Sequence, residues 1–384
     1  RLFWPDSIQA KINLTELNGA NLMAFAPPTA NIPKDISPTA LAAVIDLGSD
    51  GKLTITDLAL TAKPDISIKG SLEASTLSPL TGSASVGFDS MPVSRILELA
   101  NPFLPEAAKT VQWQSGKTSA GVSLNLASGA VSNLQAWVKP QELTFSAKPL
   151  GAPVEKLSGS ISYQGNRVTW QGLSARLAGT SLESKSGDID ISAGFTGQAE
   201  LAAGVEMAPL LKALDKFLPP EVSKMALTGS VKAAGKLLIK GPASTYDGTL
   251  NMTGLRFTPP GAVPIEIIKG NARVSNLGMT SGSVVFEGLE AQTAGVSLKA
   301  GGEVDAAKGY RGKSDISAHI DGEEFVKAFQ KVLPAEAVKM KVGGQVDVAG
   351  TLKINGKEST VDAKVTLAKV RFTPPVGGTP IEIE

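Results

Sequence analysis

The ten residues Val231-Lys-Ala-Ala-Gly-Lys-Leu-Leu-Ile-Lys240 decide the fold class of this chain. Val, Ala, Leu and Ile take odd positions in this stretch, and lysines take positions 232, 236 and 240. Alternation with a period of two residues is typical of a β-strand with one apolar face and one wet face. The stretch 345–354 repeats the pattern, with Val346 and Val348 on the apolar side and Asp347 on the other.

The strand that follows each of these stretches changes phase once. Leu250 and Met252 precede Gly254, after which Leu255 takes over the apolar side, and an equivalent change falls 115 residues later at Lys369. One extra residue turns every later side chain to the other face, so a phase change kept at this spacing predicts a β-bulge that bends the strand.

Three sequence motifs recur with one period of about 115 residues. Internal repetition of this kind is the signature of a stacked array in which each unit contacts its neighbours. The motifs are Phe103-Leu-Pro105, Phe217-Leu-Pro219 and Val332-Leu-Pro334; Leu255-Arg-Phe-Thr-Pro-Pro260 and Val370-Arg-Phe-Thr-Pro-Pro375; and the stretches 53–58, 168–173 and 284–289.

The period divides the chain into four segments: a partial unit 1–90, whole units 91–204 and 205–320, and a partial unit 321–384. Apolar residues at helical spacing predict one short amphipathic helix per unit, within 92–108, 207–218 and 323–332. The fold class we expect is mainly β, an elongated repeat array of curved antiparallel sheet. Because the chain starts without Met and stops inside a unit, we expect a piece of a longer protein.

The composition argues against several classes of function. Lys plus Arg number 37 against 36 Asp plus Glu, so no net charge favours nucleic acid. Cysteine is absent, which excludes thiolate chemistry, and His319 is the single histidine, so the commonest general base and transition-metal ligand is nearly missing. No apolar run approaches the roughly 20 residues of a membrane-spanning helix. We therefore expect a protein that is not an enzyme, with no cofactor, no metal and no nucleic-acid partner.

Two polar constellations have a functional and an ordinary interpretation. His319 could pair with Asp315 or Asp321 as a base or ligand, but without a second histidine we expect an ordinary strand or surface residue. Asp188 and Asp190 could act as paired carboxylates, but alternation places both on the polar side of a strand beside a turn, where we expect solvated groups.

The apolar side of the strands is the strongest candidate for a functional surface. A sandwich or barrel would bury such a face, whereas an open curved sheet fills it with its own side chains, a helix or a ligand. Ordinary core packing and contact with acyl chains both remain open for these residues. They are Val231, Leu237, Ile239, Leu250, Met252, Val284, Phe286, Val296, Leu298, Val346, Val348, Leu352, Ile354, Val365 and Leu367.

The order of motifs within a unit resembles the AsmA-like superfamily of Gram-negative bacteria, of the AsmA, TamB and YhdP type. A strand pair leads to Phe-Thr-Pro-Pro, a Pro-Ile-Glu-Ile strand, the segment 276–289, and a helix that ends in Leu-Pro. The resemblance covers nearly the whole chain, is best from about residue 165 onward, and is weak over the proline-rich residues 1–50.

This resemblance implies a long sheet folded lengthwise into a "taco" with a continuous hydrophobic groove. It implies a periplasmic protein, anchored in the inner membrane through segments outside this chain, with envelope proteins as further partners. The implied function is bridge-like lipid transport in outer membrane biogenesis, in which acyl chains lie in the groove and phospholipid passes between inner and outer membranes. The alternative is a structural spacer of the cell envelope with a protein-filled interior.

Overall fold

The chain is mainly β: it forms twenty strands in antiparallel sheet, with three short helices in the part that the structure describes. The structure is a computed structural model. It describes residues 7–16, 37–63, 66–100, 111–147, 150–192, 194–215, 226–258, 263–278, 281–305, 309, 311–330, 333, 338, 341–355, 358–373 and 381–383. The chain divides into two compact units, unit 1 with residues 1–176 and 184–197, and unit 2 with residues 177–183 and 198–384.

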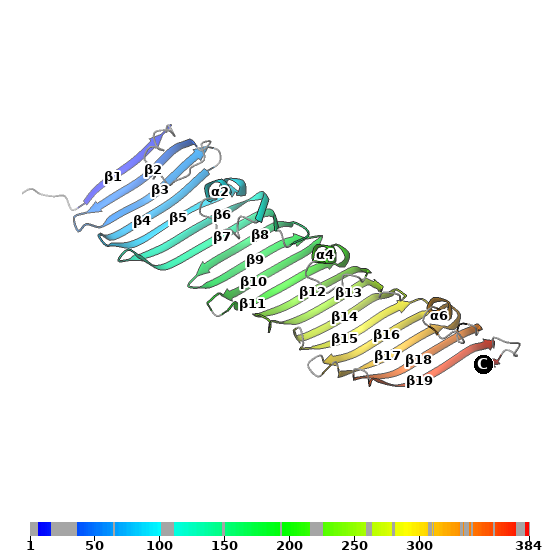
Figure 1. Cartoon of the computed structure of the whole chain (residues 1–384). Coiled ribbons are helices and arrows are strands. Elements are labelled where there is room, and N and C mark those ends of the chain that lie inside the picture. The colour runs from blue at the N-terminus through cyan, green and yellow to red at the C-terminus, as the bar shows by residue number, and fades with distance from the viewer. Residues whose placement is uncertain are drawn as a thin grey trace, which may run out of the picture. The chain divides into compact units, whose positions relative to one another are not determined.

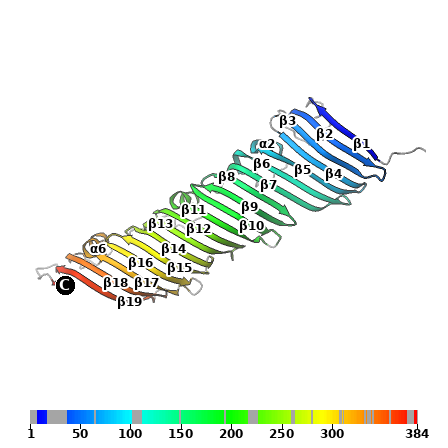
Figure 2. The same cartoon turned by 180° about the vertical axis from the view of Figure 1, so that it is seen from behind.

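Unit 1 contains consecutive antiparallel strands. From β1 to β8, each strand pairs with the next one in sequence, as both views show (Figures 1 and 2). These strands are β1 (Ser7–Thr15), β2 (Ser37–Gly48), β3 (Leu53–Lys63), β4 (Ile66–Leu77), β5 (Leu80–Pro92), β6 (Val111–Ala127), β7 (Ala130–Ala147) and β8 (Val154–Gln164). The strands β9 (Arg167–Leu177), β10 (Thr180–Asp190) and β11 (Thr196–Glu206) contain the divisions between the units.

Unit 2 follows the same meander. Each strand from β12 to β20 pairs antiparallel with the next. These strands are β12 (Ala226–Lys240), β13 (Thr245–Thr258), β14 (Ile265–Leu277), β15 (Ser283–Thr293), β16 (Val296–Asp305), β17 (Arg311–Asp321), β18 (Lys341–Asn355), β19 (Thr360–Thr373) and β20 (Ile381–Ile383).

The predicted β-bulges are present. In unit 2, Gly254 has φ +57° and breaks the register between β12 and β13, and Lys369 has φ +52° where β18 pairs with β19. A third bulge lies in unit 1, where Glu142 has φ +52° between β6 and β7. Each bulged residue faces a glycine on the partner strand that also has a positive φ: Gly229, Gly344 and Gly116 respectively. Bulges of this kind bend a strand and increase its twist.

The predicted helices α2 (Val93–Ala100), α4 (Met207–Ala213) and α6 (Gly322–Phe329) are also present. They begin 114 and 115 residues apart, and six strands separate each helix from the next. In unit 2, α4 and α6 lie at the same end of the strands (Figure 1). The Leu-Pro motifs expected at the helix ends fall mostly outside the described residues. None of the described helices has the length and apolar character needed to cross a membrane.

The helices pack on their neighbouring strands. The side chain of Asp321 caps α6 by accepting a hydrogen bond from the backbone N–H of Glu324 at 2.9 Å. The rings of Phe325 and Phe329 stack with centroids 4.7 Å apart. In unit 1, Ile96 of α2 packs against a small core that includes Ile66 and Met91.

Candidate apolar binding surface

Strand register gathers the apolar residues of unit 2 on one face of the sheet, here called the apolar face. One row of directly paired residues crosses eight strands, from β12 to β19, and an adjacent row crosses seven, from β12 to β18. The first row is Ala233, Leu250, Ala272, Phe286, Gly302, Ser314, Leu352 and Val361, and the second is Gly235, Gly248, Val274, Val284, Val304, Gly312 and Ile354.

Two further rows complete the apolar face over β16 to β19. Both contain residues that alternation had predicted on this side. The rows are Val296, Ile320, Val346 and Leu367, and Leu298, Ala318, Val348 and Val365. The register therefore places the predicted stripe together on one face, while its contact with lipid stays a prediction.

The apolar face is only partly covered by the protein itself. Among the fifteen predicted residues, thirteen are half-buried, and Val365 and Leu367 on β19 are exposed by 55% and 36%. An apolar surface that is not sealed by protein is typical of binding surfaces.

Unit 1 has an equivalent face. The row Leu72, Ala84, Leu124 and Leu134 crosses β4 to β7, and the row Gly70, Val86, Val122 and Ala136 lies next to it. Val86 is exposed by 52% and Leu134 by 40%. No groove residue was predicted in this unit, although the alternation of β5 and β6 would have identified these positions.

The opposite face of unit 2 is charged. Lys269 and Lys299 both approach Glu290, at 3.2 and 3.7 Å, and Arg273 approaches Glu287 at 3.2 Å. In each pair the two side chains come from neighbouring strands, as expected for the solvated side of a sheet. Exposed pairs of this kind contribute little to stability, so their role is to keep this face in water.

His319 lies on the charged face, as the ordinary interpretation predicted. Its Nδ1 is 2.7 Å from Oδ1 of Asp347, its register partner on β18, and both side chains are about half exposed. Asp315 instead accepts a hydrogen bond from Thr351 at 2.9 Å, and Asp321 caps α6. Neither functional pairing considered for His319 is therefore present.

Asp188 and Asp190 have separate partners and do not form a carboxylate pair. Asp188 accepts a hydrogen bond from Arg167 at 2.7 Å, while Asp190 accepts one from the hydroxyl of Ser192 at 2.6 Å. The hydrogen bond to Asp188 and the charge of that carboxylate raise the pKa of Arg167 above its ordinary value. Asp188 and Asp190 are half-buried rather than fully solvated.

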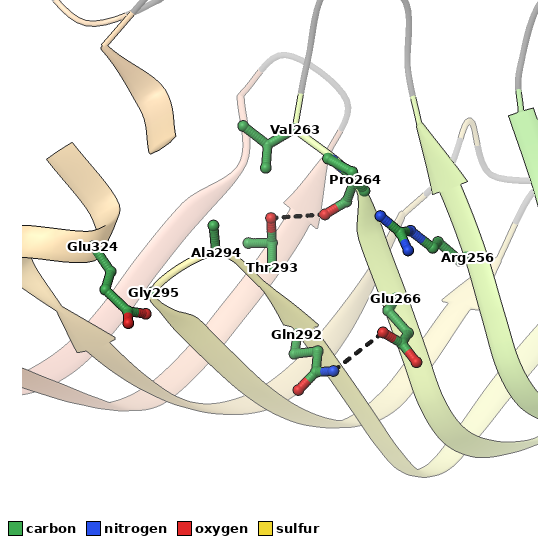
Figure 3. Close-up of a pocket in the computed structure, with 9 residues that line it drawn as sticks. All are labelled: Arg256, Val263, Pro264, Glu266, Gln292, Thr293, Ala294, Gly295 and Glu324. Atoms are coloured by element: carbon green, nitrogen blue, oxygen red, sulfur yellow. Dashed lines mark hydrogen bonds between the residues drawn. The ribbon is translucent and has the colours of Figure 1, made fainter. Parts of the chain in front are cut away.

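A polar pocket of about 360 Å³ lies where β13, β14 and β15 approach α6 (Figure 3). Arg256, Glu266 and Glu324 supply its charges, and the side chain of Gln292 donates to Glu266 at 3.1 Å. This pocket could not be predicted from the sequence, because its residues come from four separate elements. Across the described residues, no group of three acidic, histidine or cysteine side chains has the arrangement of a metal site.

Sequence reasoning also missed Tyr246, Ala272 and Val274, which belong to the apolar face. Ala272 and Val274 are buried, with 3% and 1% exposed. Tyr246 lies an even number of positions before Leu250 and Met252, so the alternation of β13 could have predicted it on the same face. Comparisons with protein-family models, curated proteins and solved structures found no match for this chain.

Proposed function

We propose that the apolar face binds acyl chains, and that the chain is a segment of a bridge-like protein that conducts phospholipid between the inner and outer membranes of a Gram-negative bacterium. The observation that carries this proposal is the alignment of apolar rows across up to eight strands, whose side chains, apart from the buried Ala272 and Val274, are half-buried or exposed. Such a surface offers an acyl chain similar contacts at every strand.

The mechanism requires no catalysis. Burial of one methylene group contributes about 0.8 kcal/mol, so a long acyl chain gains enough from the face to leave water. Because each row presents mostly small or aliphatic side chains on successive strands, displacement along the row by one strand replaces apolar contacts with other apolar contacts and changes the free energy little. The phospholipid head group would stay in water beyond the ends of the strands.

The resemblance to the AsmA-like superfamily supports the remaining parts of the proposal. These are the lengthwise folding of the sheet into a groove, the repeat units with boundaries near residues 91, 205 and 321, the periplasmic location and an anchor in the inner membrane. The repeated spacing of α2, α4 and α6 and of the bulges is consistent with units of this length.

Two adjacent leucines provide a matched test of the acyl-chain surface. Leu237 lies on the apolar face and is half-buried, whereas Leu238 lies on the charged face and is 50% exposed. Leu237→Glu would place a carboxylate beneath the lipid, and its desolvation would cost several kcal/mol. Leu238→Glu leaves the carboxylate in water.

The chain is expressed without detergent, and bound phospholipid is measured by native mass spectrometry and organic extraction. Wild type and Leu238→Glu are expected to carry phospholipid, and Leu237→Glu to have lost it while keeping the β-sheet circular dichroism spectrum. A folded Leu237→Glu variant with as much lipid as Leu238→Glu would contradict the proposal.

A structural spacer is the second candidate, because protein covers part of the apolar face in unit 1. Ile68, Phe88 and Ile96 of α2 pack there against the buried cluster of Ala62, Ile66 and Met91. If helices and side chains fill the face throughout, the wild type yields no lipid, and all three proteins behave alike in the extraction.

A further inference from the structure

Among the described residues of unit 2, three polar side chains lie on the side of the sheet that carries the apolar face: Tyr246, Thr293 and Ser314. Two of them are satisfied by backbone carbonyls. The hydroxyl of Thr293 donates to Pro264 at 2.9 Å, and that of Ser314 donates to Gly301 at 3.3 Å. The hydroxyl of Tyr246 exposes less than 1 Å² and has no hydrogen-bond partner.

Tyr246 lies near the margin of the apolar face. It is the second residue of β13, and its register partners Leu237 and Leu277 also stand close to strand ends. Its hydroxyl reaches inward over Gly248, where a Cβ atom would lie 2.5 Å from the phenol oxygen. Gly248 is itself flanked by Gly235 and Val274, which carry no polar side-chain atoms, and the carbonyl oxygen of Ala234 lies on the same side of Gly248 but does not bond the hydroxyl.

A buried hydroxyl without a partner destabilises a folded protein, because it has lost its hydrogen bonds to water. A trapped water molecule is a poor remedy here, since buried waters require two to four polar partners and the neighbouring side chains supply none. The suitable partner is an acceptor atom carried by an otherwise apolar molecule. The ester carbonyl that joins an acyl chain to glycerol has this chemistry.

We propose that the Tyr246 hydroxyl donates a hydrogen bond to the ester carbonyl of an acyl lipid bound on the apolar face. This hydrogen bond makes the surface around Tyr246 prefer ester-linked over ether-linked chains. The inference rests on the proposed function and names the lipid class. The ring of Tyr246 is half-buried, and the proposal requires a rotation of this side chain that brings its hydroxyl to a ligand on the face. The marginal position suits an ester, because the acyl tail extends over the aliphatic rows while the head group stays in water.

The test uses two lysophospholipids with the same phosphocholine head group and sixteen-carbon chain, one a palmitoyl ester and the other a hexadecyl ether. Each is titrated calorimetrically, below its micelle concentration, into the full delipidated chain. The proteins are wild type, Tyr246→Phe and a matched control, Tyr163→Phe. Tyr163 lies on the equivalent face of unit 1, but its hydroxyl has a partner, Asn166, at 3.4 Å.

Wild type is expected to bind the ester about fivefold more tightly than the ether, because this ratio of dissociation constants corresponds to the free energy of one ordinary hydrogen bond. Tyr246→Phe is expected to bind both equally, and Tyr163→Phe to keep the preference. In the absence of lipid, Tyr246→Phe is also expected to melt at a higher temperature than wild type, because it removes the unpaired hydroxyl.

Equal binding of the two lysolipids by wild type, or a preference that survives in Tyr246→Phe, would overturn the inference and leave the proposed function intact. Failure of wild type to bind either lysolipid would overturn both. An infrared spectrum of carbonyl-labelled ester lipid provides a direct readout: the carbonyl band should lie at lower frequency on wild type than on Tyr246→Phe.

Discussion

The bulge between β12 and β13 yields a sharp prediction about two facing glycines. Gly229 has φ +98°, and a Cβ atom there would overlap the carbonyl oxygen of Gly254 and lie 2.6 Å from the Cα of Leu255. Gly254 has φ +57°, but a Cβ atom there would meet nothing within 4 Å. The two glycines therefore face different penalties on substitution by alanine.

The magnitudes follow from these contacts. Gly254→Ala incurs the left-handed backbone penalty of about 1–2 kcal/mol, partly offset by about 0.4–1 kcal/mol from a less flexible unfolded chain. Gly229→Ala incurs a larger backbone penalty, because φ +98° lies outside the left-handed α region, and must also push the backbone of β13 aside, which costs about 1–3 kcal/mol more. Lys369 occupies the position equivalent to Gly254 with φ +52°, so a side chain is tolerated there, and Lys369→Gly should be stabilising or neutral.

The assay is denaturant unfolding combined with hydrogen exchange of peptides that cover residues 226–258, because an array of strands can lose structure locally. Gly229→Ala should speed exchange in this segment far more than Gly254→Ala. If Gly229→Ala matched wild type, or if Gly254→Ala were the more damaging change, the bulge geometry would be wrong.

Two further predictions concern α6 and Tyr246. Asp321→Ala removes the N-cap of α6 and should lower the free energy of unfolding by about 1 kcal/mol, whereas Asp321→Asn should keep most of the stability. Equal unfolding midpoints for wild type and Asp321→Ala would refute the role of the cap. Burial raises the pKa of the Tyr246 phenol above 10.0, so the folded chain keeps this proton to higher pH than the unfolded chain. The stability of the fold is then independent of this phenol's ionisation below about pH 10 and falls as the pH rises through the raised pKa. A titration of tyrosinate absorbance, wild type minus Tyr246→Phe, should show this late ionisation, and a step below pH 10 would contradict it.

Much of the sheet could be predicted because strand alternation is a local signal. The pattern of residues 231–240 predicts β12 and the side on which Val231 and Leu237 lie, and the phase changes at Gly254 and Lys369 predict the bulges. The short helices followed from apolar spacing, although α2 is described only as far as Ala100.

Features that depend on partner strands could not be predicted in the same way. The pairing of His319 with Asp347 depends on the register between β17 and β18, which are joined by a helix and a connection. The pocket around Arg256 and Glu324 combines residues far apart in sequence. The unpaired hydroxyl of Tyr246 depends on the absence of side chains at Gly235 and Gly248, which are brought together only by pairing.

The most direct measurement of the central claim is photo-crosslinking along β18 in the intact protein. A photoreactive amino acid is placed in turn at positions 346, 347, 348 and 349, and crosslinking to phosphate-labelled phospholipid is measured. Val346 and Val348 belong to the apolar face, and Asp347 and Ala349 to the charged face. Binding on the apolar face predicts lipid adducts at 346 and 348 and none at 347 and 349. Equal labelling at all four positions, or labelling at none, would contradict it.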